Sequence, residues 1–309
     1  MDISFVIPVF NEEGNVTQLH TEIINTVTPL SKSYEIIFVN DGSTDNTLSA
    51  LQKLRPIKII NFRKNFQQTA ALDAGLRIAQ GNIVITMDGD LQNNPSDIPA
   101  MLNKIEEGFD VVTGWRWQRN DPVSKKIISR VANFLRHFLI DDHIHDSGCG
   151  FKAIRKECLA NLDLYGEMHR FIPGLLLWQG FKITEIKIDH RPRTNGVTKY
   201  TASRILKGFL DMGSVWFWRK FSTRPLHIFG SLGLTIGTAG SGLLLFLLFI
   251  QIFNINWPHT STWPMVGFFM VFTGIQLIVS GLLADVALKN YYRANKSKPY
   301  SIKNIINNE

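Results

Sequence analysis

Residues 82–95 read "NIVITMDGDLQNNP", and this stretch decides how the chain folds. Its apolar, β-branched beginning predicts a buried strand over residues 82–90, and Pro95 predicts the start of a helix. Two aspartates, Asp88 and Asp90, flank one glycine where the strand ends. Such a turn either caps the next helix or holds a metal ion against a phosphate, because hard divalent cations prefer carboxylate oxygens.

The same alternation of strand and helix runs through the N-terminal part of the chain. Repetition of this order predicts an α/β fold with a mainly parallel, doubly wound sheet, because parallel strands are joined through crossover helices. The expected strands cover residues 3–10, 34–41, 57–62, 82–90 and 110–116, and the expected helices begin near Gly14, at a cap formed by Ser43 or Thr44, at Gln68 and at Pro95.

Polar residues gather where four of these strands end, in "PVFNEE", "VNDGSTD", "NFRKNF" and "MDGDLQ". The carboxyl ends of parallel strands meet at one edge of a sheet, where ligands bind. Turn chemistry explains one such cluster, but four at the same edge indicate a site. No GxGxxG follows the first strand, and GxxxxGK[ST], HExxH and GxSxG are also missing, which argues against a dinucleotide-binding fold of the usual type.

The C-terminal part of the chain has a different composition. From Ile228 to Ala284 it contains no Asp, Glu, Lys or Arg. The apolar runs at 226–253 and 263–288 each exceed the roughly 20 residues that cross a bilayer core, so they predict a transmembrane hairpin. A pair of buried core helices is the alternative.

Basic residues flank both apolar runs, which places a soluble N-terminal domain and both termini in the cytoplasm. The formal net charge of +7 fits a membrane surface or an anionic substrate, and no nucleic-acid motif accompanies it. Before the first run, an amphipathic segment is expected in the membrane interface, with a helix packed on the soluble domain as the alternative. The expected parts are a domain at 1–200, the interfacial segment at 201–225, the two spans and a basic tail at 289–309.

Six segments together resemble the family 2 glycosyltransferases with the GT-A fold: "PVFNEE", "VNDGSTD", "MDGDLQNNP", "GCGFKAIRKE", "GEMHRFIP" and "RPRTNGVTKY". They look most like the subgroup that includes dolichyl-phosphate mannose synthases and bacterial undecaprenyl-phosphate glucosyltransferases. The resemblance covers nearly the whole chain. It implies an integral protein of the cytoplasmic membrane that transfers one sugar from a nucleotide-sugar to polyprenyl phosphate with inversion. UDP is favoured over GDP, and a homo-oligomer is left open.

The resemblance also implies a donor site. Asp88, Asp90 and Gln92 would hold Mg²⁺ or Mn²⁺ on the diphosphate. Asp41 would accept a hydrogen bond from the base, with an Asx-turn as its local alternative, and Asn65 would lie near the donor or cap a helix. The nucleotide-sugar-binding residues that the resemblance implies are Pro8, Phe10, Asn11, Glu12, Asp41, Asn65, Asp88, Gly89, Gln92, Arg193 and Lys199.

On the acceptor side, the resemblance implies that Arg116, Arg130 and Arg170 hold the lipid phosphate. A solvated surface charge is the alternative for each of Arg170, Arg193 and Lys199. The catalytic candidates are Asp90 and Asp146, of which Asp146 matches the acidic residue proposed as a base. A phosphate monoester has a second pKa near 6, so its oxygen is already largely ionised at pH 7 and a base is less necessary. Asp146 would then orient the acceptor or the sugar.

Two other functions are weighed against this one. A membrane-tethered, non-catalytic nucleotide-binding protein is expected to lack one of the metal or phosphate groups, yet Asp88, Asp90, Arg116 and Arg130 are all present. A glycosyltransferase with a non-lipid acceptor makes less use of the apolar hairpin.

Overall fold

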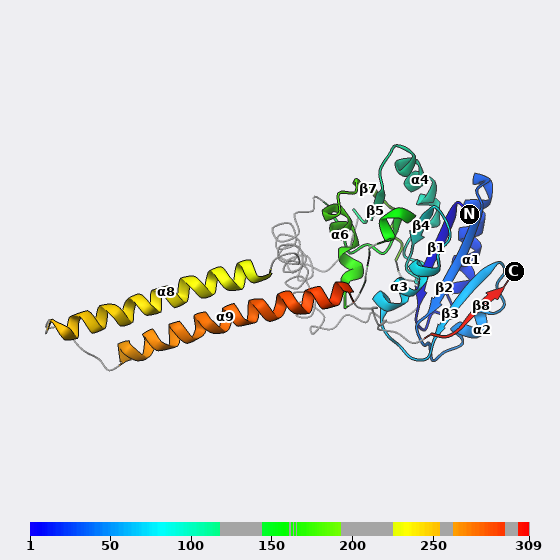
Figure 1. Cartoon of the computed structure of the whole chain (residues 1–309). Helices are drawn as coiled ribbons and strands as arrows, with labels where there is room; N and C mark the ends of the chain where they lie inside the picture. The colour runs from blue at the N-terminus through cyan, green and yellow to red at the C-terminus, as the bar shows by residue number, and fades with distance from the viewer. Residues whose placement is uncertain are drawn as a thin grey trace. The chain divides into compact units, whose positions relative to one another are not determined.

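The computed structural model describes residues 1–117, 144–160, 162, 164, 166–192, 225–253, 262–293 and 302–308. The chain divides into two compact units (Figure 1). The first, Met1–Val215 with Lys298–Glu309, is called the sheet unit, and the second, Trp216–Ser297, the hairpin unit.

An eight-stranded sheet forms the centre of the described sheet unit, in the order β7-β5-β6-β4-β1-β2-β3-β8. The predicted fold class, an α/β fold with a mainly parallel sheet, is confirmed: β6 is antiparallel to β4 and β5, β8 is antiparallel to β3, and the remaining pairs are parallel. The strands are β1 (Ile3–Val9), β2 (Tyr34–Asn40), β3 (Ile57–Phe62), β4 (Ile83–Thr86), β5 (Val111–Trp115), β6 (Lys152–Arg155), β7 (Ile183–Lys187) and β8 (Ile302–Asn308).

Helices cover both faces of this sheet. Successive strand residues point to opposite faces, so Phe5 belongs to one core and Val6 to the other. The first core is completed by α1 (Val16–Val27), α2 (Thr47–Leu51) and α4 (Ile98–Glu106), and the second by α3 (Gln68–Ile78) and α6 (Ile172–Trp178). The short 3₁₀ helices are η1 (Thr28–Leu30), η2 (Pro95–Asp97), η3 (Lys156–Leu159) and η4 (Met168–Phe171).

Several local expectations need correction. The strand expected at 82–90 ends at Thr86, because the chain turns away before Asp88. Neither Ser43 nor Thr44 caps α2, which begins at Thr47; the Ser43 hydroxyl instead donates to Asn40 Oδ1.

The C-terminal tail, expected at 289–309, contains a strand that the sequence analysis did not predict. Part of it forms β8, which pairs with β3 from Ile57 to Phe62. An edge strand of this kind covers the backbone donors and acceptors that β3 would otherwise present to solvent.

Strand direction defines one functional edge of the sheet. The carboxyl ends of β1, β2, β3, β4, β5 and β7 lie at the same edge, which we call the carboxyl edge. The antiparallel β6 begins at this edge, because Thr86 pairs with Lys152 and Ile83 with Arg155. The antiparallel β8 also begins there, because Ile302 pairs with Phe62, so the ends of six strands and the starts of two meet at this edge.

The hairpin unit contains α8 (Pro225–Ile252) and α9 (Thr262–Arg293). Both carry spans long and apolar enough to cross a membrane, with mean hydropathies of 2.0 and 2.1 over Leu226–Ile252 and Thr262–Ala284. The helices approach closely at Gly233 and Gly274: a Cβ on Gly233 would lie 2.5 Å from the Gly274 carbonyl oxygen. Of the interfacial segment expected at 201–225, residues 201–224 lie outside the described part of the chain.

Candidate active site

Hydrogen bonds join the loop after β1 to the loop after β2. Asn11 has a positive φ of 56°, and its Oδ1 accepts from the Thr44 backbone N–H at 2.8 Å. The Asn11 N–H donates to Ser43 Oγ at 2.9 Å, and the Glu12 N–H donates to Thr47 Oγ1 at 2.8 Å. The predicted donor residues Asn11 and Glu12 therefore shape the carboxyl edge between neighbouring strands.

Asp41 ties the loop after β2 to the loop after β3. Its side chain is buried, and its Oδ1 accepts from the Phe66 N–H at 2.6 Å. Gly42 follows with a φ of +67°, and a Cβ there would lie 2.3 Å from the Lys64 carbonyl carbon. Asn65 is not the helix cap: its Oδ1 accepts from the Gln67 N–H at 3.2 Å, and Gln67 occupies the N-cap position of α3.

The Asp-Gly-Asp turn follows β4 in the middle of the carboxyl edge. Gln68 Nε2, from the first turn of α3, donates to Asp88 Oδ1 at 2.7 Å. Asp90 is 8% exposed, and its Oδ1 accepts from the Gln92 N–H at 3.2 Å. Gly89 packs on the end of β1, where a Cβ would lie 2.6 Å from Val9 Cγ1.

The surroundings of Asp88 raise its pKa. Burial is the largest cause, and the negative charge of Asp90 adds to it; Arg116, Lys152 and the hydrogen bond from Gln68 act in the opposite direction. A buried carboxylate whose ionised form is disfavoured by burial and by a neighbouring acid suits a site that receives a cation.

Arg116 and Asp146 make a two-pronged ion pair at the end of β5. Arg116 Nε donates to Asp146 Oδ2 at 2.6 Å, and an Arg116 terminal nitrogen donates to Oδ1 at 2.8 Å. Their side chains are 17% and 14% exposed, so the pair is mostly removed from water. The structure thus joins a predicted acceptor residue to a predicted catalytic residue.

Lys152 was not expected at this site. It opens β6, is 2% exposed, and donates through Nζ to the Cys149 carbonyl. Burial lowers its pKa, while Cys149, Asp88 and Asp146 act in the opposite direction. Both cysteines are free and buried, and burial raises the pKa of the Cys149 thiol to about 11. The only sequence signal for Lys152 was its place in the "GCGFKAI" segment.

A short segment after β7 supports the Asp-Gly-Asp turn from outside. The Arg191 N–H donates to the Gln92 carbonyl at 2.9 Å, and Gln92 Nε2 lies 3.5 Å from the Arg191 carbonyl. The Arg191 guanidinium bonds Glu22 on α1 and Asn94, each at 2.7 Å. Arg191 lies two residues before the predicted Arg193, and its role depends on contacts between segments far apart in sequence.

Arg170 forms a local ion pair with Glu167 at 3.1 Å, and the neighbouring His169 shares a hydrogen bond of 2.7 Å with Thr69 on α3. Three further predicted site residues, Arg130, Arg193 and Lys199, lie outside the described residues. Pro8 is buried within β1, and Phe10 lies half-buried just beyond it.

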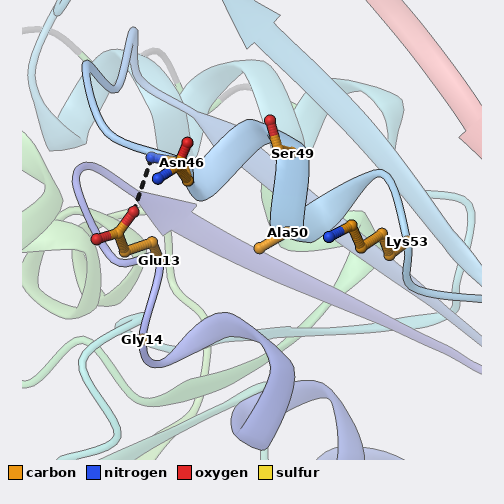
Figure 2. A pocket seen from close by; sticks show the side chains of 6 residues that line it. All are labelled: Glu13, Gly14, Asn46, Ser49, Ala50 and Lys53. Carbon is orange, nitrogen blue, oxygen red and sulfur yellow. Dashed lines mark hydrogen bonds between the residues drawn. The ribbon is translucent and has the colours of Figure 1, made fainter.

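A shallow hollow of about 460 Å³ lies beside the first two loops (Figure 2). Glu13, Gly14, Asn46, Ser49, Ala50 and Lys53 line it. Glu13 Oε2 accepts from the Asn46 N–H at 2.9 Å across its rim. It contains neither aspartate of the Asp-Gly-Asp turn, so we do not regard it as the reaction centre.

The sheet, the helices on both faces and the acidic turn at the carboxyl edge define a glycosyltransferase of the GT-A type. The chain belongs to glycosyl transferase family 2, whose model matches residues 4–162. Membership confirms the resemblance read from the sequence motifs, and the protein is therefore a glycosyltransferase enzyme.

Curated relatives match almost the whole chain. Dodecaprenyl-phosphate galacturonate synthase of Rhizobium johnstonii is 37% identical over 318 residues, covering 100% of this chain and 94% of that protein. Undecaprenyl-phosphate 4-deoxy-4-formamido-L-arabinose transferase of Pseudomonas aeruginosa is 30% identical over 312 residues, covering 98% and 90%.

The fold also matches a solved enzyme. Glucosyl-3-phosphoglycerate synthase of Mycobacterium tuberculosis, in complex with Mn²⁺, UDP and glucosyl-3-phosphoglycerate, superimposes with a TM-score of 0.53 at 20% identity. The match covers 71% of this chain and 79% of that one. At this identity the likeness supports the fold alone.

Proposed function

We propose that the protein transfers a single sugar from a nucleotide-sugar, with UDP as the favoured nucleotide, to polyprenyl phosphate. The observation that carries the proposal is that the Asp88–Asp90 turn and the Arg116–Asp146 pair meet at one sheet edge. Curated relatives named for polyprenyl phosphates match the chain over nearly its full length. The apolar hairpin gives such a protein access to a lipid acceptor.

Asp88 and Asp90 are the proposed ligands of Mg²⁺ or Mn²⁺. Among the described residues there is no group of three His, Cys, Asp or Glu side chains that could enclose a metal. Two carboxylates fit an ion whose remaining ligands come from a substrate diphosphate and water. When bound, the divalent ion neutralises charge on the departing nucleotide diphosphate. The solved neighbour that contains Mn²⁺ and UDP is consistent with this assignment.

Asp146 is proposed to orient Arg116 rather than to remove a proton. Both carboxylate oxygens of Asp146 accept hydrogen bonds from Arg116. An ionised phosphate oxygen can form the bond to the anomeric carbon directly, while the bond from that carbon to the diphosphate breaks with its electron pair. The reaction inverts the anomeric centre and releases no proton that a base must take.

The rate–pH profile separates the two roles of Asp146. If Asp146 orients Arg116, the Asp146→Asn variant should lose activity at every pH with an unchanged profile shape, because one of the two hydrogen bonds from the Arg116 side chain is lost and the other no longer has a charged acceptor. Disappearance of the acidic limb of kcat in this variant would instead support a base.

The hairpin is proposed to cross the cytoplasmic (inner) membrane twice, with both ends in the cytoplasm. The pairing of β8 with β3 supports this topology, because residues after α9 then belong to the same folded unit as residues before α8. The basic flanks favour the cytoplasmic side.

The deciding experiment incubates the full-length protein in detergent with undecaprenyl phosphate and a panel of UDP- and GDP-sugars. We expect one donor to yield a lipid-linked sugar, with loss of turnover when EDTA removes divalent ions. Asp90→Asn should abolish turnover, while Glu107→Gln, which changes an exposed residue on the sheet unit, should not. Nucleotide binding without any transfer would favour a tethered binding protein, and transfer to 3-phosphoglycerate alone would favour a non-lipid acceptor.

A further inference from the structure

A further cation, Lys187, lies at the carboxyl edge, on the strand beside the one that Arg116 follows. Lys187 ends β7 and pairs in register with Trp115, the last residue of β5. The Ile188 N–H continues the pairing by donating to the Trp115 carbonyl at 3.1 Å. Adjacent strands lie about 4.8 Å apart, so Lys187 leaves the sheet beside the residue that precedes Arg116.

Two tryptophans support the Lys187 side chain. Its Nζ lies 5.5 Å from the ring centroid of Trp115 and 5.0 Å from that of Trp117. Lys187 is exposed, and Trp117 is 52% exposed. Cation–π contacts of this kind restrict a flexible ammonium group without neutralising its charge.

The nearby acid is already engaged. Glu185 lies on the same face of β7, two residues before Lys187. Its Oε2 accepts from the His145 backbone N–H at 2.9 Å, and its Oε1 contacts His145 Nδ1. His145 in turn stacks on Trp115, with centroids 4.2 Å apart. Within the described ranges, Lys187 makes no ion pair.

Arg116 and Lys187 therefore differ in the charge that each offers to a phosphate. The charge of Arg116 is balanced by a bidentate carboxylate, whereas Lys187 is exposed on an aromatic support and has no acidic partner among the described residues. A phosphate monoester carries up to two negative charges and needs cationic donors that are not already neutralised.

We propose that Lys187, Trp115 and Trp117 form a binding platform for the head of the acceptor. The Lys187 ammonium donates to a phosphate oxygen, and the exposed ring of Trp117 contacts the first apolar units of the prenyl chain. This inference rests on the proposed function and adds to it a basis for specificity. The platform would select an acceptor that is a phosphate monoester and bears an apolar chain.

The test measures steady-state kinetics of the full-length protein in detergent with a short-chain prenyl phosphate, so that no bilayer surface is present. Lys187→Met should raise the KM for prenyl phosphate about tenfold or more, because a charge-assisted hydrogen bond is lost. The KM for the nucleotide-sugar should stay within about twofold, and Lys187→Arg should restore much of the acceptor affinity. Trp117→Ala should raise the acceptor KM as well.

Lys182 provides the matched control, because it is an exposed lysine just before the other end of β7. Lys182→Met should leave both KM values unchanged. An unchanged acceptor KM in Lys187→Met, with normal wild-type turnover, would overturn this inference alone. So would a variant that loses only binding to phosphatidylglycerol vesicles, since Lys187 would then serve the membrane surface. A wild-type protein that transfers no sugar to prenyl phosphate would overturn the proposed function together with this inference.

Discussion

Gly150 has no side chain, and the carboxylate of Asp88 lies where one would be. A Cβ at Gly150 would be 2.4 Å from Asp88 Oδ1 and 2.5 Å from Oδ2. The Gly150 carbonyl also accepts from Thr86 Oγ1 at 2.7 Å, which holds its backbone in place. At the scale of single residues, the site thus depends on the absence of one methyl group.

Gly150→Ala is therefore expected to displace Asp88 and to reduce kcat by about 100-fold, since a shift of 1 Å at a reacting centre can cost that much. Mn²⁺ binding should weaken in parallel. Gly148→Ala is the control in the same loop, because its Cβ would make only an ordinary contact, 3.9 Å from Asp146 Oδ1, and should leave Mn²⁺ affinity unchanged. Wild-type Mn²⁺ affinity in Gly150→Ala would show that Asp88 does not need this position.

Glu35 makes a pH-dependent contribution to the free energy of unfolding. It lies near the start of β2, away from the candidate active site at the carboxyl edge. Burial alone would raise its pKa, but hydrogen bonds from Lys58, Ser4 and the Gln80 backbone outweigh it and lower the pKa below 4.5. The stabilisation is thus complete above the unfolded-state pKa and is lost as the pH falls through the lower folded-state pKa.

Glu35→Gln should lower the free energy of unfolding by about 2 kcal/mol at pH 7, because charge-assisted hydrogen bonds are lost. Thermal unfolding followed by circular dichroism from pH 7 to pH 3 measures it. The difference in the free energy of unfolding between wild type and variant should narrow as the pH falls below 4.5. A gap that is constant over this range would contradict an ionised Glu35.

At the scale of elements, α8 and α9 associate through small residues. Lipid offers little hydrophobic drive for helix association, so close packing at glycines carries more weight in a membrane. Gly233 and Gly274 bring the two backbones together, because a Cβ on Gly274 would lie 2.6 Å from the Gly233 carbonyl oxygen. Large apolar side chains such as Leu245 and Phe268 point outward and are exposed.

Gly233→Leu is expected to separate the helices and to destabilise the hairpin by about 1–3 kcal/mol, the usual range for overpacking. Thermal unfolding of the full chain in detergent should show a lower transition. Gly242→Leu adds the same side chain to α8 where a Cβ has nothing within 4 Å, and it should change little. Equal effects of both substitutions would argue against the glycine contact.

At the scale of the whole molecule, β8 returns the chain to the sheet after the hairpin. Its first residue, Ile302, pairs with Phe62 at the carboxyl edge, and Asn308 pairs with Ile57 at the other edge. Among the described elements, the two edge strands of the sheet, β7 and β8, are the ones that precede and follow the hairpin in sequence.

Proline tests whether this strand is paired. Alternate residues of an antiparallel strand donate to the neighbour, so of Ile305→Pro and Ile306→Pro one should remove a ladder hydrogen bond and the other should not. We expect one variant to lose about 1–2 kcal/mol more stability than the other. Two variants with wild-type thermal transitions would show that β8 does not pair with β3.

The sequence by itself determined the local chemistry and the class of fold. Apolar runs of fixed period specify strands and helices, and the Asp-Gly-Asp turn after β4 specifies a candidate cation site, because these features depend on neighbours along the chain. The spans over 226–253 and 263–288 were read in the same way.

Only the tertiary structure decided which side chains meet. The pairing of Arg116 with Asp146, the clamp of Arg191 on the turn after β4, and the support of Lys187 by two tryptophans join segments separated by 30 to 99 positions in the chain. The pairing of β8 with β3 also joins two segments that lie far apart in the sequence, residues 57–62 and 302–308. Contacts of this kind follow from strand order and register, and no local pattern encodes either of these, because the partners are chosen when the sheet assembles.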